Sequence, residues 1–233
     1  MSTQVAAISE IFSSLQGEGT HLGERHLFVR FEACNIHCEY CDELGKPGYD
    51  FDLNSVIESL KKLDQESGPH SYVSLTGGEP LLYVSFLKPL LPRIKEMGLK
   101  TYLETSGILW KALEQVISLA DVVAMDVKPA SVTKEKSFLK EHEAFLKIAL
   151  RKETFIKMIC SKEIDLDEFR ELCTMIARIS RNVTLILQPI SGAIEGHDDL
   201  ELMRLLGELQ TIGLAMLKDV RIVPRLHKIL KIR

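Results

Sequence analysis

Short apolar, β-branched runs alternate with longer helical patterns along most of the chain, and this alternation constrains the fold more than any other feature. Parallel strands need long crossover connections, which helices supply. The alternation therefore predicts an α/β fold with a parallel sheet and outer helices. The predicted strands are Val5–Phe12, His26–Phe31, Tyr72–Leu75, Lys100–Glu104, Val122–Asp126, Thr154–Ile159 and Val183–Gln188.

The clearest predicted helix spans 165–179, where apolar side chains recur at i, i+3 and i+4 spacing and so share one face. That face carries Leu166, Phe169, Leu172, Cys173, Met175, Ile176 and Ile179. A similar spacing near the end of the chain predicts a second helix with Leu200, Met203, Leu206 and Leu209 on its apolar face.

The chain has 233 residues, and no linker, repeat or low-complexity tract divides it, so we expect one domain over 1–233. The formal charge of −4 argues against a general nucleic-acid binder. No apolar run approaches the roughly 20 residues of a membrane span, and residues 1–7 lack the pattern of a secretory signal. We therefore expect a cytoplasmic protein whose five cysteines are metal ligands or free thiols.

Three cysteines, Cys34, Cys38 and Cys41, follow the second predicted strand with the spacing C-x3-C-x2-C. Closed zinc sites and four-iron clusters usually take four protein ligands. Three thiolates on a cluster would leave one iron open to an external ligand, which is a catalytic arrangement. A three-thiolate zinc site and unliganded thiols are the alternatives. Cys160 and Cys173 lie among apolar residues, and we expect them to be structural.

Three polar motifs also follow predicted strands. The carboxyl ends of parallel strands meet at one edge of a sheet, so we expect these motifs to share a rim with the cysteines. Glycines let a backbone approach a ligand closely, and the Glu79 carboxylate is suited to an ammonium group. In isolation the first motif is a turn before a helix, and each of the other two is a solvated strand end or a helix cap. The motifs are Thr76-Gly77-Gly78-Glu79-Pro80, Leu103-Glu104-Thr105-Ser106-Gly107 and Met125-Asp126-Val127-Lys128-Pro129.

Polar residues near the N-terminus suggest a small-molecule pocket. Gln16 and Glu18 offer an amide and a carboxylate suited to the edge of a heterocycle. Arg30, at the end of a predicted strand, can pair with a carboxylate. A glycine turn after an edge strand, with a surface arginine, is the alternative interpretation.

The cysteine spacing and the Thr-Gly-Gly-Glu-Pro motif together resemble the radical S-adenosylmethionine (SAM) superfamily. The resemblance implies a partial (β/α)6 TIM-like barrel with a 4Fe-4S cluster on the three cysteines. The open iron would bind SAM, and no protein nucleophile is needed. SAM-binding roles would fall to Tyr40, Cys41, Asp42, Gly77, Gly78, Glu79, Ser106, Asp126, Val127, Lys128 and, more weakly, Gln188.

Within that superfamily the chain resembles the 7-carboxy-7-deazaguanine synthases of queuosine biosynthesis. The resemblance includes Ser-Leu-Gln-Gly-Glu-Gly at 14–19, Phe-Val-Arg at 28–30 and the tail at 220–227. It implies a lyase that converts 6-carboxy-5,6,7,8-tetrahydropterin to 7-carboxy-7-deazaguanine with loss of ammonia. Segments 1–24 and 214–233 would pack on the rim, and substrate would contact Leu15, Gln16, Gly17, Glu18, Arg30, Thr76 and His227.

The same resemblance implies partners and a metal. It implies a one-electron reductant such as flavodoxin or ferredoxin, a homodimer, and no direct contact with nucleic acid or membrane. The family usually has Cys-Asp-Thr or Cys-Asp-Ser after the cluster, and that hydroxyl binds Mg2+. Here Glu43 takes that position, where it either binds Mg2+ differently or replaces the need for it.

Two further departures bear on function. The tail ends without the Trp-Gly typical of the family. The Asp126-Val127-Lys128 run is similar to one in the glycyl-radical activating enzymes, which makes an enzyme acting on a partner protein the alternative function.

Overall fold

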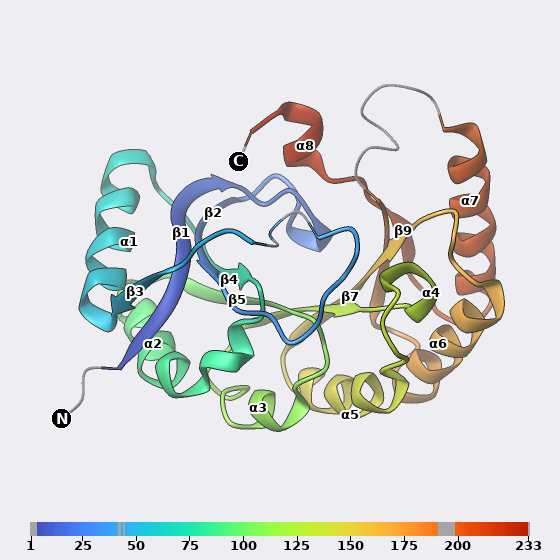
Figure 1. Ribbon diagram of the computed structural model, residues 1–233, viewed down its shortest axis with the longest axis horizontal. Coiled ribbons are helices and arrows are strands. Elements are labelled where there is room, and N and C mark those ends of the chain that lie inside the picture. Colours follow the sequence, from blue (N-terminus) through green and yellow to red (C-terminus); the bar gives the residue numbers. More distant parts are fainter. Residues whose placement is uncertain (1–3, 42, 44, 191–198, 233) are drawn as a thin grey trace.

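A nine-stranded sheet, curved into an open half-barrel, organises the part of the chain that the computed structural model describes, residues 4–41, 43, 45–190 and 199–232 (Figure 1). The spatial order of the strands is β3-β1-β2-β4-β5-β6-β7-β8-β9. From β2 to β9 every neighbouring pair is parallel. The predicted α/β fold with a mostly parallel, unclosed sheet is confirmed. The strands are β1 Val5–Leu15, β2 Arg25–Phe31, β3 Tyr49–Asp52, β4 Tyr72–Gly77, β5 Lys100–Thr105, β6 Val122–Val127, β7 Glu153–Cys160, β8 Thr184–Pro189 and β9 Val220–Ile222.

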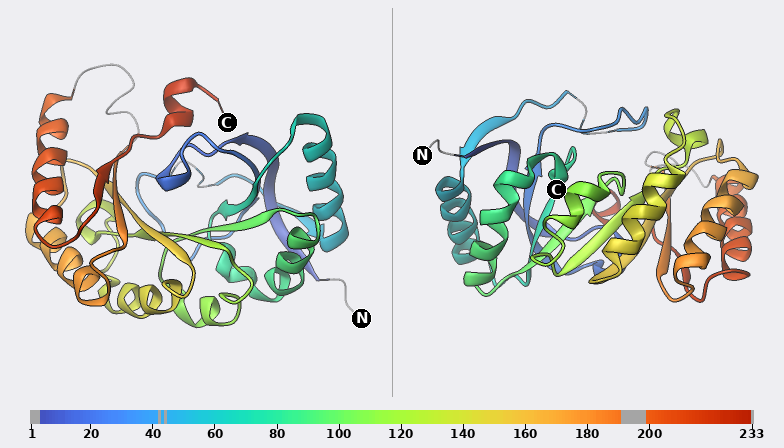
Figure 2. Two further views of the ribbon diagram at one scale, coloured as in Figure 1. Left: turned by 180° about the vertical axis from the view of Figure 1, so that it is seen from behind. Right: turned by 90° about the horizontal axis from the view of Figure 1, so that it is seen from below.

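The long helices lie on the outer side of the curved sheet, as both views of Figure 2 show. The short helix α8 and the C-terminus lie across the open side of the half-barrel. Among the described residues, no helix has both the length and the apolar character that a bilayer crossing requires. The helices are α1 Leu53–Ser67, α2 Val84–Glu96, α3 Trp110–Glu114, α4 Ala130–Thr133, α5 Leu139–Ala149, α6 Leu166–Ile179, α7 Leu200–Leu214 and α8 Leu226–Leu230, with 3-10 turns η1 Gly19–His21 and η2 Pro80–Tyr83.

The expectation of a parallel sheet fails at its N-terminal edge. Strand β1 pairs antiparallel with β2, and β3 pairs antiparallel with β1. The connection between β1 and β2, residues 16–24, is too short for the crossover that a parallel pair needs. A hairpin is therefore the only arrangement open to these two strands.

Two short strands were not predicted from the sequence. Strand β3, Tyr49–Asp52, alternates aromatic with acidic residues and lies exposed at the edge of the sheet. Strand β9, Val220–Ile222, is too short to show a period. Strand β1 also continues past its predicted end to Leu15, which carries the chain from the sheet edge to the rim.

The predicted helix at 165–179 is confirmed as α6, which buries Phe169, Leu172, Cys173, Met175 and Ile176. Helix α7 also forms where predicted, and its predicted apolar face is correct for Leu206 and Leu209 only. Its buried residues are Leu202, Leu206, Leu209 and Gly213, whereas Leu200 and Met203 are exposed. Leu202, Leu206 and Leu209 follow one another at i, i+4 and i+7 spacing, so they share the face of the helix that packs on the sheet.

Among the described residues the core has two main parts, one on each face of the sheet, and a small third cluster of Ile36, Cys38, Ile108 and Phe138. The larger lies between the sheet and the helices. The smaller fills the inside of the half-barrel near the amino ends of the strands, with Tyr72, Tyr102, Val122, Ala124, Phe155 and Ile186. Apolar packing at that end leaves the carboxyl ends of the strands as the place for a cavity.

The N-terminus of α6 offers a test of how this helix is held. The Asp165 carboxylate accepts hydrogen bonds from the backbone amides of Asp167, at 2.9 Å, and Glu168, at 2.8 Å. We expect Asp165→Ala to lower the free energy of unfolding by about 1 kcal/mol, because two amides lose their acceptor. Urea unfolding measures the change. Asp165→Asn keeps an acceptor and is the control; equal losses in both variants would contradict the cap.

Candidate active site

A cavity of about 430 Å³ opens at the carboxyl ends of the parallel strands, and it is called the rim cavity below. Its volume lies within the range typical of small-molecule pockets. Most predicted site residues line it: Cys34, Cys38, Cys41, Tyr40, Gly77, Gly78, Ser106, Asp126, Lys128, Gln188, Leu15, Gln16, Gly17, Glu18, Arg30, Thr76, His227 and Glu43. The structure thus brings together side chains that are up to 212 positions apart, from Leu15 to His227.

Three predicted site residues stand apart. Glu79 and Val127 are buried in the wall and do not line the rim cavity. Asp42 lies outside the described residues. The loop after β8, residues 191–198, which contains Glu195 and His197, is outside them as well.

The three cysteines of the loop after β2 are free thiols on one cavity. Cys34 and Cys41 are exposed, and Cys38 is buried. Burial raises the pKa of the Cys34 and Cys38 thiols. No fourth cysteine among the described residues lines the rim cavity, since Cys160 and Cys173 are buried in the core. Burial also raises the pKa of each of those two thiols to about 12, which keeps them unreactive as expected.

Glycines at the end of β4 hold the start of the cysteine loop. The amide of Gly78 donates to the Phe31 carbonyl at 2.8 Å, and the amide of Glu79 donates to the Ala33 carbonyl at 2.7 Å. A Cβ on Gly78 would lie 2.1 Å from the Ala33 carbonyl oxygen. These glycines therefore permit close approach to the backbone of the cysteine loop, and the same segment lines the rim cavity.

The Glu79 carboxylate is fully buried and accepts hydrogen bonds from four donors of the chain itself. Its Oε2 accepts from the Ser106 amide at 2.7 Å and the Ser106 hydroxyl at 2.6 Å. Its Oε1 accepts from the Thr105 hydroxyl at 2.9 Å and the Leu81 amide at 3.0 Å. Burial raises the pKa of Glu79, and these donors oppose the rise. In this arrangement Glu79 positions Ser106 at the cavity wall.

Several buried polar atoms of the cavity wall lack partners within the described chain. They are Oδ1 of Asp126 and both amide atoms of Gln188, which is fully buried. The other oxygen of Asp126 pairs with the Lys128 ammonium at 2.8 Å. Buried polar atoms without partners are costly, so a polar ligand fits this wall. The three free thiols on the same cavity are the donors that an iron–sulfur cluster takes.

Two further charged residues, Lys157 and Glu104, contribute to the cavity wall and were missed by the sequence analysis. The Lys157 ammonium forms an ion pair with Glu18 and lies 3.7 Å from Asp126. Burial disfavours the Glu18 carboxylate, but Lys157 outweighs it and holds the pKa of Glu18 at about 2. A lysine inside an otherwise apolar buried strand was the signal that could have identified it.

Glu104 connects the N-terminal segment with the end of β4. Its Oε1 accepts a hydrogen bond from the side-chain amide of Gln16 at 2.9 Å, and its Oε2 accepts one from the Thr76 hydroxyl at 2.9 Å. Burial raises the pKa of Glu104. One buried carboxylate thus fixes two predicted substrate residues, Gln16 and Thr76. Glu104 belongs to the motif at 103–107, in which the sequence analysis assigned a role to Ser106 only.

The tail closes the cavity on the open side of the half-barrel. The amide of Leu226 donates to the Gly17 carbonyl at 2.9 Å. A Cβ on Gly17 would lie 2.1 Å from Nδ1 of His227, so only glycine allows the tail to sit this close. Arg225, His227, Lys228 and Ile232 line the rim cavity from this side.

Buried His142 supports the wall from behind and gives a pH-dependent prediction. Its Nδ1 lies 2.9 Å from the Gly107 carbonyl, and its Nε2 accepts from the Lys128 amide at 3.1 Å. Burial lowers the pKa of His142 to about 4. In the unfolded chain this histidine takes up a proton near pH 6.5, whereas in the folded protein it does so only near pH 4. The contribution of neutral His142 to the free energy of unfolding is therefore complete above pH 6.5 and is lost as the pH falls toward 4.

We expect His142→Gln to flatten this pH dependence by up to about 1.4 kcal/mol per pH unit. Urea unfolding at pH 7 and pH 5 compares the variant with the wild-type chain. His37→Gln, at an exposed histidine, is the control and should keep the wild-type slope. An unchanged slope in His142→Gln would contradict this role.

Comparisons with known proteins agree on one family. Residues 28–206 match the radical SAM superfamily. The 7-carboxy-7-deazaguanine synthase of Geobacter sulfurreducens is 34% identical to this chain, over 98% of both chains. The enzyme of the same name from Methanopyrus kandleri is 31% identical, over 95% of this chain and 92% of its own. A crystal structure of QueE from Escherichia coli matches the fold with a TM-score of 0.65 at 20% identity, covering 96% of this chain and 95% of that chain.

Proposed function

Because the chain belongs to the radical SAM superfamily and, within it, to the 7-carboxy-7-deazaguanine synthases, we propose that it converts 6-carboxy-5,6,7,8-tetrahydropterin to 7-carboxy-7-deazaguanine with loss of ammonia. The observation that carries the proposal is the single rim cavity that joins the three-cysteine loop to Gln16, Glu18 and Arg30. When bound, a 4Fe-4S cluster and SAM supply a carbon radical able to remove one hydrogen atom from a substrate.

The chain's own residues bind and orient the reactants. Cys34, Cys38 and Cys41 would hold the cluster. We assign the SAM contacts to the wall that carries the unpartnered Asp126 oxygen and the Gln188 amide. Two ion pairs, Lys128 with Asp126 and Lys157 with Glu18, hold the charged groups of this wall in fixed positions.

The part of the same cavity that Gln16, Glu18 and Arg30 line, next to the SAM wall, would bind the pterin. The Gln16 amide and Glu18 carboxylate face the same cavity, and both are fixed by partners on other strands. Arg30 lies over the Phe12 ring at 5.5 Å with Nη1 3.2 Å from Glu43, and its remaining N–H donors would pair with the substrate carboxylate. His227 and the rest of the tail cover the cavity, where exclusion of water protects a reactive radical.

The alternative function, activation of a glycyl-radical partner, is not supported by the relatives. The Asp126 and Lys128 side chains, which suggested it, pair with each other. We also propose, from the family resemblance, a flavodoxin- or ferredoxin-type reductant, a homodimer and a cytoplasmic setting.

Product formation tests the proposed function. We expect anaerobically reconstituted protein, with SAM, dithionite and carboxytetrahydropterin, to yield carboxydeazaguanine detectable by mass spectrometry. Cys34→Ser should lose both product and bound iron, because it removes one of three ligands. Cys173→Ala, at a core cysteine, is the matched control and should retain both. Formation of deoxyadenosine without carboxydeazaguanine would contradict the proposed substrate but not the assignment to the radical SAM superfamily.

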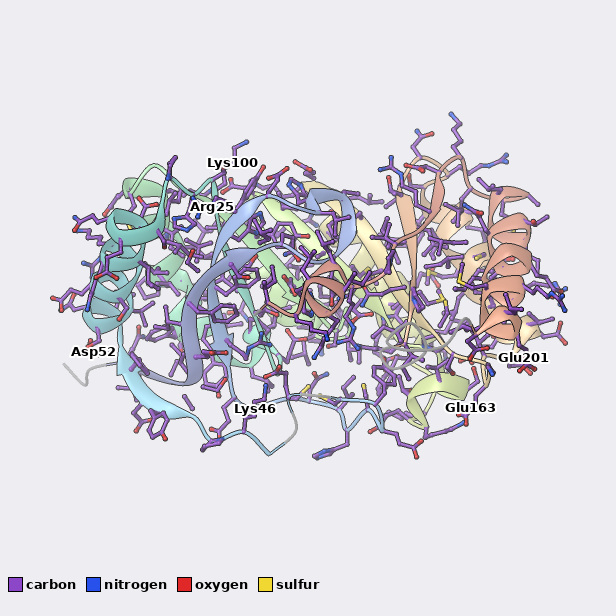
Figure 3. The ribbon with its side chains drawn as sticks, turned by 90° about the horizontal axis from the view of Figure 1, so that it is seen from above. Arg25, Lys46, Asp52, Lys100, Glu163 and Glu201 are labelled. Carbon is purple, nitrogen blue, oxygen red and sulfur yellow. The ribbon has the colours of Figure 1, made fainter. Side chains whose placement is uncertain are left out.

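The residues around Glu43 do not fit a Mg2+ site. The Lys46 ammonium lies 2.9 Å from both Glu43 oxygens, and Nη1 of Arg30 lies 3.2 Å from one of them. Figure 3 shows Lys46 on the loop that leads to β3. Two cations already neutralise this carboxylate and would repel a divalent ion. We propose that Lys46 supplies the positive charge that a metal supplies elsewhere in the family.

Dependence on added metal distinguishes these cases. We expect the wild-type enzyme to bind substrate equally well with and without added Mg2+, as measured by isothermal titration calorimetry. Lys46→Ala should weaken binding about tenfold or more, the usual cost of a lost charged hydrogen bond. Lys61→Ala, at an exposed helix position, should change nothing. Wild-type binding that occurs only with added Mg2+ would show that the metal is required.

A further inference from the structure

Two buried histidines and a glutamate come together at the end of the half-barrel opposite the rim cavity. His21 belongs to η1, in the connection between β1 and β2, and His26 lies at the start of β2. Arg25 and Lys100, the first residues of β2 and β5, lie at the edge of the molecule opposite Lys46 in Figure 3. The two imidazole rings pack on Tyr72 and Tyr102, within the inner core cluster. This group takes no part in the chemistry proposed above.

The ligand-type atoms of His21, Glu24 and His26 converge. They lie within 4.8 Å of one another, and no other such group of three occurs among the described residues. Oε2 of Glu24 is 3.2 Å from Nδ1 of His21 and 3.8 Å from Nε2 of His26. Ligands of a tetrahedral zinc ion at about 2.0–2.1 Å lie roughly 3.3 Å apart, so the 3.2 Å separation suits a shared ion directly and the longer ones require the side chains to close slightly on it.

The two inward nitrogens have no hydrogen-bond partner in the described chain. Nδ1 of His21 and Nε2 of His26 are both buried and both unsatisfied. The Glu24 oxygen is close to each of them, but not in hydrogen-bond geometry. Buried polar atoms without partners are rare and need an explanation. A metal ion between them satisfies both lone pairs at once.

The outward nitrogen of each ring is already occupied. Nε2 of His21 lies 2.9 Å from the Glu153 carboxylate, which can only accept, so this nitrogen carries the proton. Nδ1 of His26 lies 2.8 Å from the Ser74 hydroxyl. Metal-bound histidines are usually oriented in this way, with the second nitrogen bonded to a carboxylate or another polar group.

We propose that His21, Glu24 and His26 form a binding site for a divalent transition-metal ion, with zinc as the ion that best suits two imidazoles and a carboxylate. Glu24 is partly exposed, so the ion can enter from solvent and a water molecule can complete its coordination. The alternative without metal is an imidazolium of His21 held between Glu24 and Glu153.

A metal here would stabilise the floor of the substrate pocket. The amide of Gln16 donates to the Glu24 carbonyl at 2.7 Å, and the amide of Gly23 donates to the Gln16 carbonyl at 2.8 Å. The side chain of Gln16 and its neighbour Gly17 line the rim cavity. The ion would therefore hold one end of the connection between β1 and β2. The other end of that connection, at Gln16 and Gly17, would contact substrate.

Zinc binding to the full-length, cluster-reconstituted protein tests the site. After EDTA treatment and desalting, the protein is dialysed against buffered Zn2+. The amount of zinc bound per chain is measured by inductively coupled plasma mass spectrometry. We expect Glu24→Gln to bind zinc at least tenfold more weakly than the wild-type chain. Glu58→Gln, at an exposed position of α1, is the matched control. Zinc should raise the melting temperature of the wild type and the control, and not that of Glu24→Gln.

Location is tested independently by anomalous diffraction at the zinc edge. The proposal expects a peak between Nδ1 of His21 and Nε2 of His26. It is overturned if wild-type and Glu24→Gln proteins bind zinc equally, or if neither takes up zinc at this place. Iron content and product formation are measured on the same samples, so failure of this site is distinguishable from failure of the proposed function.

Discussion

Two backbone hydrogen bonds between the end of β4 and the start of the cysteine loop fix that loop beside the rim cavity. The amides of Gly78 and Glu79 bind the carbonyls of Phe31 and Ala33. A side chain at Gly78 would prevent this contact. Because β2 and β4 are parallel neighbours, the same contact places the three thiols beside the rim cavity. The cysteine loop is therefore fixed by the sheet and by glycine, before any cofactor binds.

The walls of the cavity show how a fold can hold many charges at little cost. Glu18 with Lys157, and Asp126 with Lys128, pair across elements that are distant in sequence. Glu79 and Glu104 instead accept several hydrogen bonds from neighbouring donors. Unpaired buried charges would be strongly destabilising. Paired in this way, they hold the polar side chains in place around the rim cavity, and the unpartnered groups of Asp126 and Gln188 form a wall that a polar ligand fits.

The sequence predicted the parallel strands and α6, because long apolar patterns have a clear period and each carries several buried side chains. It missed β3 and β9, which are short and lie at the two edges of the sheet. It placed β1 in a parallel sheet, although the length of the 16–24 connection excludes that arrangement. Local motifs identified the cysteine loop and Ser106. A charge within a buried strand marks Lys157, and the motif that supplied Ser106 contains Glu104, but the partners that fix these two residues are distant in sequence, and no local pattern reveals those pairs.

In the proposed enzyme, three thiolates hold a four-iron cluster and leave one iron open to SAM. Electron paramagnetic resonance of the anaerobically reconstituted, reduced protein detects this open iron. We expect the signal of a reduced four-iron cluster whose g values change when SAM is added, because SAM binds the open iron. A protein without a four-iron cluster, or a signal that SAM leaves unchanged, would contradict it.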